Sequence, residues 1–192
     1  MSDADQDLAA RLTEHVRREV LPLEGDAEIS ALRRYQARDR TYELVNRLLR
    51  GDPGADELSD EQDAAVRDIV RRLNQLLNRW RTPEPIRAYR GLRSRVGLDI
   101  VGDVPLVTRS FLSTTIVRGV AVSEFTVPPG PGGPAILEID VPAGTPAVWV
   151  PPLGDPALAY QGELLLPRRL PLMVRASRDE AGILVVDCEV QP

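Results

Sequence analysis

The order of its segments predicts an α+β fold for this chain, with helices first and strands second. Apolar residues recur at helical spacing up to residue 80, and short alternating or β-branched runs between prolines and glycines follow. Of the 17 prolines, 13 lie after residue 96. We therefore expect a single domain over residues 1–192, in which a helical lobe (1–84) packs on one side of a β-rich core (85–192).

Helical patterns account for the first part of the chain. The first segment has an apolar stripe at i+4 spacing, made of Leu8, Leu12, Val16 and Val20, and Pro22 ends it. The second segment runs over Glu28–Arg50 and is broken by Gly51-Asp52-Pro53-Gly54. The third opens with a capping box of Ser59 and Gln62 and ends before Pro83.

Strand patterns fill the second part. They cover Ile86–Arg90, Val107–Thr114, Ala135–Val141, Ala147–Val150, Gly162–Leu166, Pro171–Ser177 and Ile183–Val190. The single cysteine, Cys188, alternates with apolar residues of the last strand, so we interpret it as a buried thiol rather than a nucleophile. The acidic stretch Asp52–Asp63 lacks the spacing of a calcium loop and is predicted to be a solvated loop.

Composition excludes several classes of function. No run approaches the roughly 18 to 20 apolar residues of a membrane span, and the acidic start, Met1–Leu12, lacks the features of a signal peptide. A lone histidine, His15, argues against a catalytic triad or a histidine-rich zinc site. All 24 Lys+Arg residues are Arg, so P-loop, Schiff-base and kinase chemistry lack their lysine. The absence of lysine has two alternative explanations, coding bias and evasion of lysine-directed tagging.

Charge is uneven along the chain. Residues 1–96 hold 18 Arg and 18 acidic residues, whereas residues 97–192 hold 6 Arg and 11 acidic residues, which accounts for the net charge of −5. An acidic domain without a basic stripe is a poor general binder of nucleic acid.

The end of one predicted strand carries a carboxylate and a carboxamide. In an extended chain, Gln161 and Glu163 point to the same side, while Leu164 and Leu166 anchor the other face in the core. Burying a carboxylate at the end of an apolar strand costs free energy, so a carboxylate at this position is expected to have a function. These two residues are therefore predicted to face one pocket.

Two other strand ends are polar. Arg90 shares its side of a strand with Ile86 and Ala88, so its guanidinium needs an anion, either a structural salt-bridge partner or a ligand phosphate. Ser113 and Thr115 share one face at the end of the next strand. Such hydroxyl residues are often turn formers, so this pattern alone is weak.

In chain order, these strand ends resemble the Arg-Ser-Glu class of mono-ADP-ribosyltransferases, in the bacterial exoenzyme-toxin branch with a Gln-x-Glu catalytic motif. The first motif is similar to Tyr89-Arg90-Gly91-Leu92, the Ser-Thr-Ser motif to Phe111-Leu112-Ser113-Thr114-Thr115, and the catalytic segment to Gln161–Arg168. Weaker similarity includes Ile136–Thr145, Tyr35 and Asn46–Arg50, so the resemblance covers residues 28–190. Thr115 stands where the family usually has a serine.

The resemblance implies a split β-sandwich core of the ADP-ribosyltransferase type, with NAD as co-substrate and no metal. It assigns Glu163 to stabilising the oxocarbenium-like ribose, Ser113 to orienting Glu163, and Arg90 to holding the phosphates of NAD. Thr114 and Thr115 belong to the same NAD site. Arg118 and Phe125 resemble phosphate and nicotinamide contacts.

The resemblance also implies a macromolecular target. The loop Pro151–Gln161 would select it, with Tyr160 and Gln161 in contact with it, and glutamine at position 161 goes with acceptors other than arginine. We expect a protein target rather than nucleic acid, no membrane partner, and a secreted or delivered effector that acts in a target cell's cytoplasm, with room for a neutralising partner or delivery component. Two alternatives stay open: an NAD glycohydrolase, and a non-catalytic module of the same fold that binds NAD or a partner.

Overall fold

A mixed β-sheet forms the centre of the computed structural model, which describes residues 1–21, 25–37, 39–52, 58–96, 98 and 105–191. The strands are β1 (Ile86–Leu92), β2 (Leu106–Val107), β3 (Leu112–Thr115), β4 (Ala135–Val141), β5 (Val148–Trp149), β6 (Glu163–Leu166), β7 (Pro171–Glu180) and β8 (Ile183–Val190). Their order in the 8-stranded sheet is β2-β7-β8-β4-β1-β3-β6-β5.

The sheet is narrowly joined in its middle. Strands β1 and β3 meet at one residue pair, Tyr89 and Thr115, whereas β1 pairs with β4 over its whole length. Strands β4 and β8 run parallel, and every other pairing is antiparallel. The sheet is thus split into a larger part that ends at β1 and a smaller part that begins at β3.

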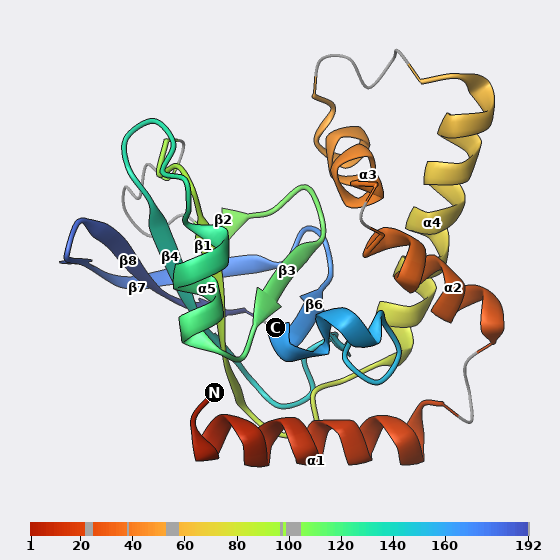
Figure 1. Ribbon diagram of the computed structural model, residues 1–192, viewed down its shortest axis with the longest axis horizontal. Coiled ribbons are helices and arrows are strands. Elements are labelled where there is room, and N and C mark those ends of the chain that lie inside the picture. The colour runs from red at the N-terminus through yellow and green to blue at the C-terminus, as the bar shows by residue number, and fades with distance from the viewer. Residues whose placement is uncertain (22–24, 38, 53–57, 97, 99–104, 192) are drawn as a thin grey trace.

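Helices flank the sheet as the sequence predicts. They are α1 (Asp3–Glu19), α2 (Asp26–Tyr35), α3 (Thr41–Arg50), α4 (Asp60–Arg79) and α5 (Arg118–Phe125). Figure 1 shows α2, α3 and α4 together on one side of the molecule, the strands on the other, and α1 across one end. The predicted α+β arrangement is confirmed, and so is the capping box of Ser59 and Gln62. The division into lobes at residues 84 and 85 stays a prediction.

The predicted helix over Glu28–Arg50 is wrong as one segment, because the chain turns between α2 and α3. Asp39 accepts hydrogen bonds from the backbone N–H and the hydroxyl of Thr41, at 3.2 and 2.7 Å, and Arg40 has a left-handed backbone with φ of 63°. A side chain that bonds to nearby backbone groups competes with helix continuation. The second α-helical segment therefore ends at Tyr35, and the chain re-enters a helix at Thr41.

Three further expectations needed correction. The predicted strand Val107–Thr114 is two strands, since β2 pairs with β7 and β3 pairs with β6 at different places in the sheet. Helix α5 and the short 3-10 helix η2 (Pro156–Gln161) were not predicted. Part of the acidic stretch, residues 53–57, lies outside the described residues, and its later part is not a loop because α4 begins at Asp60.

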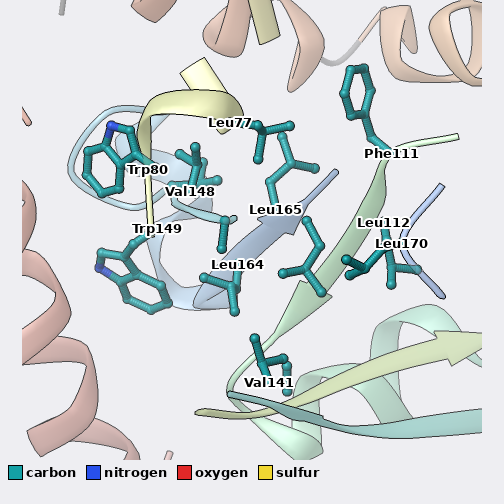
Figure 2. Close-up of a cluster of buried hydrophobic side chains, with 14 of the residues drawn as sticks. Leu77, Trp80, Phe111, Leu112, Val141, Val148, Trp149, Leu164, Leu165 and Leu170 are labelled. Carbon is teal, nitrogen blue, oxygen red and sulfur yellow. The ribbon is translucent and has the colours of Figure 1, made fainter. Parts of the chain in front are cut away.

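The core joins helices to the smaller part of the sheet (Figure 2). Its members include Leu77 and Trp80 at the end of α4, with Phe111, Leu112, Trp149, Leu164 and Leu165 from the strands and their ends. Fully burying one such side chain stabilises the fold by roughly 1.5–3 kcal/mol. Strands β3 and β6 are therefore firmly held where their polar ends emerge.

The structure bears on the predictions for the single cysteine and for membrane-spanning segments. Cys188 on β8 is buried, and burial raises its pKa to about 11, so the prediction of an inert strand thiol is confirmed. No helix within the described ranges is long and apolar enough to cross a membrane.

Candidate active site

The split in the sheet brings the three predicted strand segments together, although β1 runs on to Leu92, so Arg90 lies inside its strand and does not end it. Arg90 follows the β1 residue that pairs with Thr115 of β3, and Thr115 in turn lies opposite Glu163 of β6. Ser113 lies opposite Leu165, so Ser113 and Glu163 are diagonal neighbours on one face. The topology, rather than proximity in sequence, assembles these side chains.

Glu163 is a buried carboxylate with both oxygens hydrogen-bonded. Ser113 Oγ donates to Oε1 at 2.6 Å, and Gln36 Nε2 donates to Oε2 at 2.6 Å. Only 9% of the residue is exposed, and this burial raises the pKa of Glu163, against the opposing effects of the two hydrogen bonds and of the Arg90 charge. The carboxylate is therefore fixed in orientation and poorly hydrated, which makes it a strong local source of negative potential.

The residues before Glu163 are not extended, which corrects the expectation for Gln161. The 3-10 helix η2 ends at Gln161, Gly162 adopts a left-handed conformation with φ of 56°, and the strand begins at Glu163. A Cβ at position 162 would meet Ile116 Cγ1 at 3.2 Å and Val117 Cγ2 at 3.3 Å. Glycine is therefore favoured here by the left-handed backbone angle, and a Cβ would also crowd these two side chains.

Arg90 points toward the same split. Its Nη1 donates to the carbonyl of Ser113 at 2.7 Å, and among the described residues no carboxylate lies within ion-pair distance of it. The structural salt bridge that the sequence left open is thus absent from the described part of the chain. Burial lowers the pKa of Arg90, and its charge is available to an anionic ligand.

The two threonine hydroxyls are bonded to backbone. Thr114 Oγ1 donates to the Leu164 carbonyl at 2.6 Å, and Thr115 Oγ1 donates to the Gln161 carbonyl at 2.5 Å. Thr115 also accepts from the Val117 N–H at 2.9 Å. Threonine keeps the hydroxyl of the serine it replaces in the motif, and here that hydroxyl holds β3 to the turn before Glu163. An NAD contact by either threonine stays a prediction.

Arg118 lies in what we call the ion-pair cluster, formed by Arg87, Arg118 and Arg178 with Glu138, Asp140, Glu180 and Asp187. Its Nε bonds Glu138 at 2.8 Å, and its Nη2 bonds Glu180. The proposed phosphate contact would require Arg118 to share or leave these carboxylates. Phe125, at the other end of α5, is 39% exposed, so its ring is accessible to a ligand.

Tyr160 and Gln161 converge on a carboxylate that the sequence did not single out. Tyr160 Oη and Gln161 Nε2 both donate to Oε2 of Glu124 on α5, at 3.2 and 3.0 Å. Tyr160 is 56% exposed, as a residue that contacts a target would be. Glu124 was missed because nothing in the local pattern marks one acid of a helix that was itself not predicted.

The end of helix α2 and the residue that follows it supply two further side chains to the site. Gln36 was hidden inside the predicted long helix, and only the polar run after Tyr35 could have marked it. Tyr35 packs edge-on against Phe111 with ring centroids 6.0 Å apart, and its hydroxyl accepts from Asn46 Nδ2 at 3.2 Å. Burial, with the nearby charge of Glu163, raises the pKa of Tyr35 to about 12, so this phenol stays neutral.

The arrangement fits one kind of chemistry. Within the described ranges, no group of three or more His, Cys, Asp or Glu side chains is placed to hold a metal ion. A fixed buried carboxylate, beside an arginine that has no carboxylate partner in the described part of the chain, suits cleavage of a glycosidic bond in a phosphate-bearing donor, because positive charge develops on the sugar. The geometry is therefore compatible with an enzyme that transfers a glycosyl group.

Comparison with known proteins agrees. The sequence model of a family described as ADP-ribosyltransferase exoenzyme matches residues 6–187. The chain therefore belongs to the ADP-ribosyltransferase exoenzyme family, as the resemblance implied. A search of curated protein sequences found no match.

Several solved toxins share the fold. The Vis toxin of Vibrio splendidus has a TM-score of 0.76 at 16% identity, over 100% of this chain and 87% of that chain. Plx2a of Paenibacillus larvae has a TM-score of 0.73 at 18% identity, over 99% and 96% of the two chains. C3stau2 of S. aureus, solved with NAD, has a TM-score of 0.72 at 18% identity, over 97% and 96%.

Proposed function

We propose that this mono-ADP-ribosyltransferase cleaves NAD and transfers ADP-ribose to an acceptor other than arginine on a macromolecular target, preferably a protein. The observation that carries the proposal is Glu163, held by Ser113 and Gln36 beside Arg90, which has no carboxylate partner among the described residues. Two structures of the same fold, C3stau2 and the BECa toxin of C. perfringens, contain NAD and NADH. Secretion or delivery into a target cell, and a neutralising partner, remain parts of the proposal.

Each site residue has a role in the donor half of the reaction. Arg90 holds the phosphates of NAD in the split of the sheet. The bond between ribose and nicotinamide breaks with its electron pair leaving on the nicotinamide nitrogen, so neutral nicotinamide departs. Glu163 stabilises the cationic ribose that remains, and Ser113 keeps the carboxylate in place. The acceptor then attacks the ribose carbon and loses a proton.

Position 161 supports the choice of acceptor. A guanidinium acceptor needs a carboxylate partner, whereas Gln161 offers only hydrogen bonds. One observation favours a second candidate: Glu124 lies 3.0 Å from Gln161 Nε2, so a carboxylate is present beside this position. The Vis structure with agmatine, a guanidine compound, belongs to the same fold.

Incubation with labelled NAD tests the function and its alternatives. Nicotinamide release reports all cleavage, and mass spectrometry of target-cell extract, or of added agmatine, reports the acceptor. We expect modified protein and no modified agmatine. Labelled agmatine would establish a guanidinium acceptor, release without any labelled product would establish a glycohydrolase, and NAD binding without release would establish a binding module.

Gln161→Ala should separate acceptor positioning from donor cleavage. Transfer is expected to fall at least about tenfold, because orientation of the acceptor supplies part of the rate, while nicotinamide release persists. Both rates are followed in one reaction, and Gln75→Ala on α4 serves as the matched control. If release falls as far as transfer, Gln161 serves the donor instead.

Arg90→Lys should weaken NAD binding and leave the fold intact. The lysine ammonium keeps the charge but cannot donate two parallel hydrogen bonds to a phosphate. The loss of about one charge-assisted hydrogen bond should lower the affinity for NAD roughly tenfold. Calorimetric titration measures the affinity, and Arg175→Lys on exposed β7 is the control. Unchanged affinity in Arg90→Lys would exclude a phosphate contact by this arginine.

A further inference from the structure

Gln36 joins the buried carboxylate to the loop that precedes its strand. The amide follows the last residue of α2 and lies 127 positions from Glu163 in sequence. Its nitrogen donates to Glu163 Oε2 at 2.6 Å, and its oxygen accepts from the backbone N–H of Asp155 at 3.1 Å. If the Gln36 amide were turned around, its oxygen would face the Glu163 carboxylate and its NH2 group would face the Asp155 N–H, and neither pair can form a hydrogen bond. The two partners therefore fix the orientation of the amide.

The loop is pressed against this amide. A Cβ at Gly154 would lie 2.1 Å from Gln36 Oε1 and 2.8 Å from Val150 Cγ1, so a side chain at position 154 would have to displace the Gln36 amide. One turn earlier on α2, Arg33 Nε donates to the Leu153 carbonyl at 2.9 Å. Helix α2 therefore holds the loop at two adjacent points.

The held loop leads directly to the acceptor side of the site. Asp155 caps η2 by accepting from the Ala157 N–H at 2.9 Å, and η2 ends at Gln161. The same amide thus contacts the carboxylate on one side and the start of the segment that carries Tyr160 and Gln161 on the other. A side chain that only filled space would need neither hydrogen bond.

We propose that Gln36 is a positioning residue, which orients the Glu163 carboxylate toward the ribose of the donor and ties that orientation to the loop Pro151–Gln161. This inference rests on the proposed function, since Glu163 is taken as the residue that stabilises the ribose cation. Each carboxylate oxygen has more than one lone-pair site, so Gln36 fixes the plane of the carboxylate and leaves room for a ribose hydroxyl. Ser113 fixes the other oxygen from β3.

Gln36→Met tests the proposal, because methionine has similar length and no donor. The charged or titratable groups that face Glu163 are Arg90 from β1 and Tyr35 from α2, and both stay in place. Without the Gln36 donor, the pKa of Glu163 rises further. The ionised form is required for activity, so when the pH is lowered the variant should lose activity at a higher pH than the wild type does. We expect the acidic limb of nicotinamide release to move up by about one pH unit and the KM for NAD to stay unchanged.

A second variant and a second measurement protect the test against misfolding. Gly154→Ala displaces the Gln36 amide without altering it and should shift the acidic limb in the same direction, whereas Gln75→Met on α4 should not. A carbon-13 NMR titration of the Glu163 carboxylate, assigned with Glu163→Gln, should show the same pKa change without any turnover. Unchanged pH profile and unchanged titration in Gln36→Met would overturn the inference. Failure of the wild type to release nicotinamide would instead overturn the proposed function.

Discussion

Glu163→Gln is expected to abolish nicotinamide release and ADP-ribose transfer together, with rates lower by about 10² to 10³, or ~3 to 4 kcal/mol of transition-state stabilisation. The amide keeps the shape of the side chain and can still bond Ser113 and Gln36. It lacks the negative charge that the developing ribose cation requires. Both rates are measured with labelled NAD at saturating and at low concentration. Turnover near that of the wild type would remove Glu163 from the mechanism.

The same variant should not be less stable than the wild type. Burial raises the folded-state pKa of Glu163 above its unfolded value, so the ionised carboxylate disfavours folding once the pH exceeds the unfolded pKa. A neutral amide removes that penalty at neutral pH. The thermal unfolding midpoint should stay equal or rise, and Glu189→Gln, at an exposed ion pair on β8, should leave turnover unchanged. A large loss of stability in Glu163→Gln would make the loss of activity uninformative about charge.

Glu138→Gln should give the largest loss of stability. Glu138 on β4 receives hydrogen bonds from Arg87, Arg118 and Arg178 of the ion-pair cluster, and its side chain is 8% exposed. Burial raises the pKa of Glu138, but the hydrogen bonds from the three arginines together outweigh it and lower the pKa to about 2, from an ordinary value of 4.5. By linkage, this difference corresponds to at most about 3 kcal/mol of unfolding free energy, since solvent screens the partly exposed arginines of the pair. Breaking a mostly buried ion pair has an effect of similar size.

The pH dependence of stability follows from the same shift. Because the folded-state pKa is lowered, the stabilisation by Glu138 is fully present above pH 4.5 and is lost as the pH falls toward 2. Urea unfolding at pH 7 should show the deficit in Glu138→Gln, and the deficit should shrink when the pH is lowered below 4. The control is Asp140→Asn, whose side chain is 62% exposed, with an expected change within about 0.5 kcal/mol. Equal changes in the two variants would show that Glu138 has no special role.

Local patterns predicted the elements that depend on neighbouring residues. The capping box of Ser59 and Gln62 marked the start of α4, and alternation marked β4 and β8 with their observed bounds. Helix α5 was missed because its few residues have no clear apolar stripe, and the break at Asp39 was missed because a side-chain bond to the backbone overrides helix propensity. Sequence patterns report the periodicity of buried residues. A short helix without an apolar stripe and a local break in a helix barely change that periodicity, so the patterns do not reveal them.

By itself, the sequence determined the α+β order of the chain and the three strand segments that carry Arg90, Ser113 and Glu163, because backbone preference and side-chain alternation are local. The tertiary structure decided which of these ends meet, through the narrow junction of β1 and β3. It also decided that Gln36 reaches Glu163 and that Glu124 reaches Gln161. Those partners come from different elements packed together, and no local pattern encodes a contact whose geometry is set by how helices and strands pack across the fold.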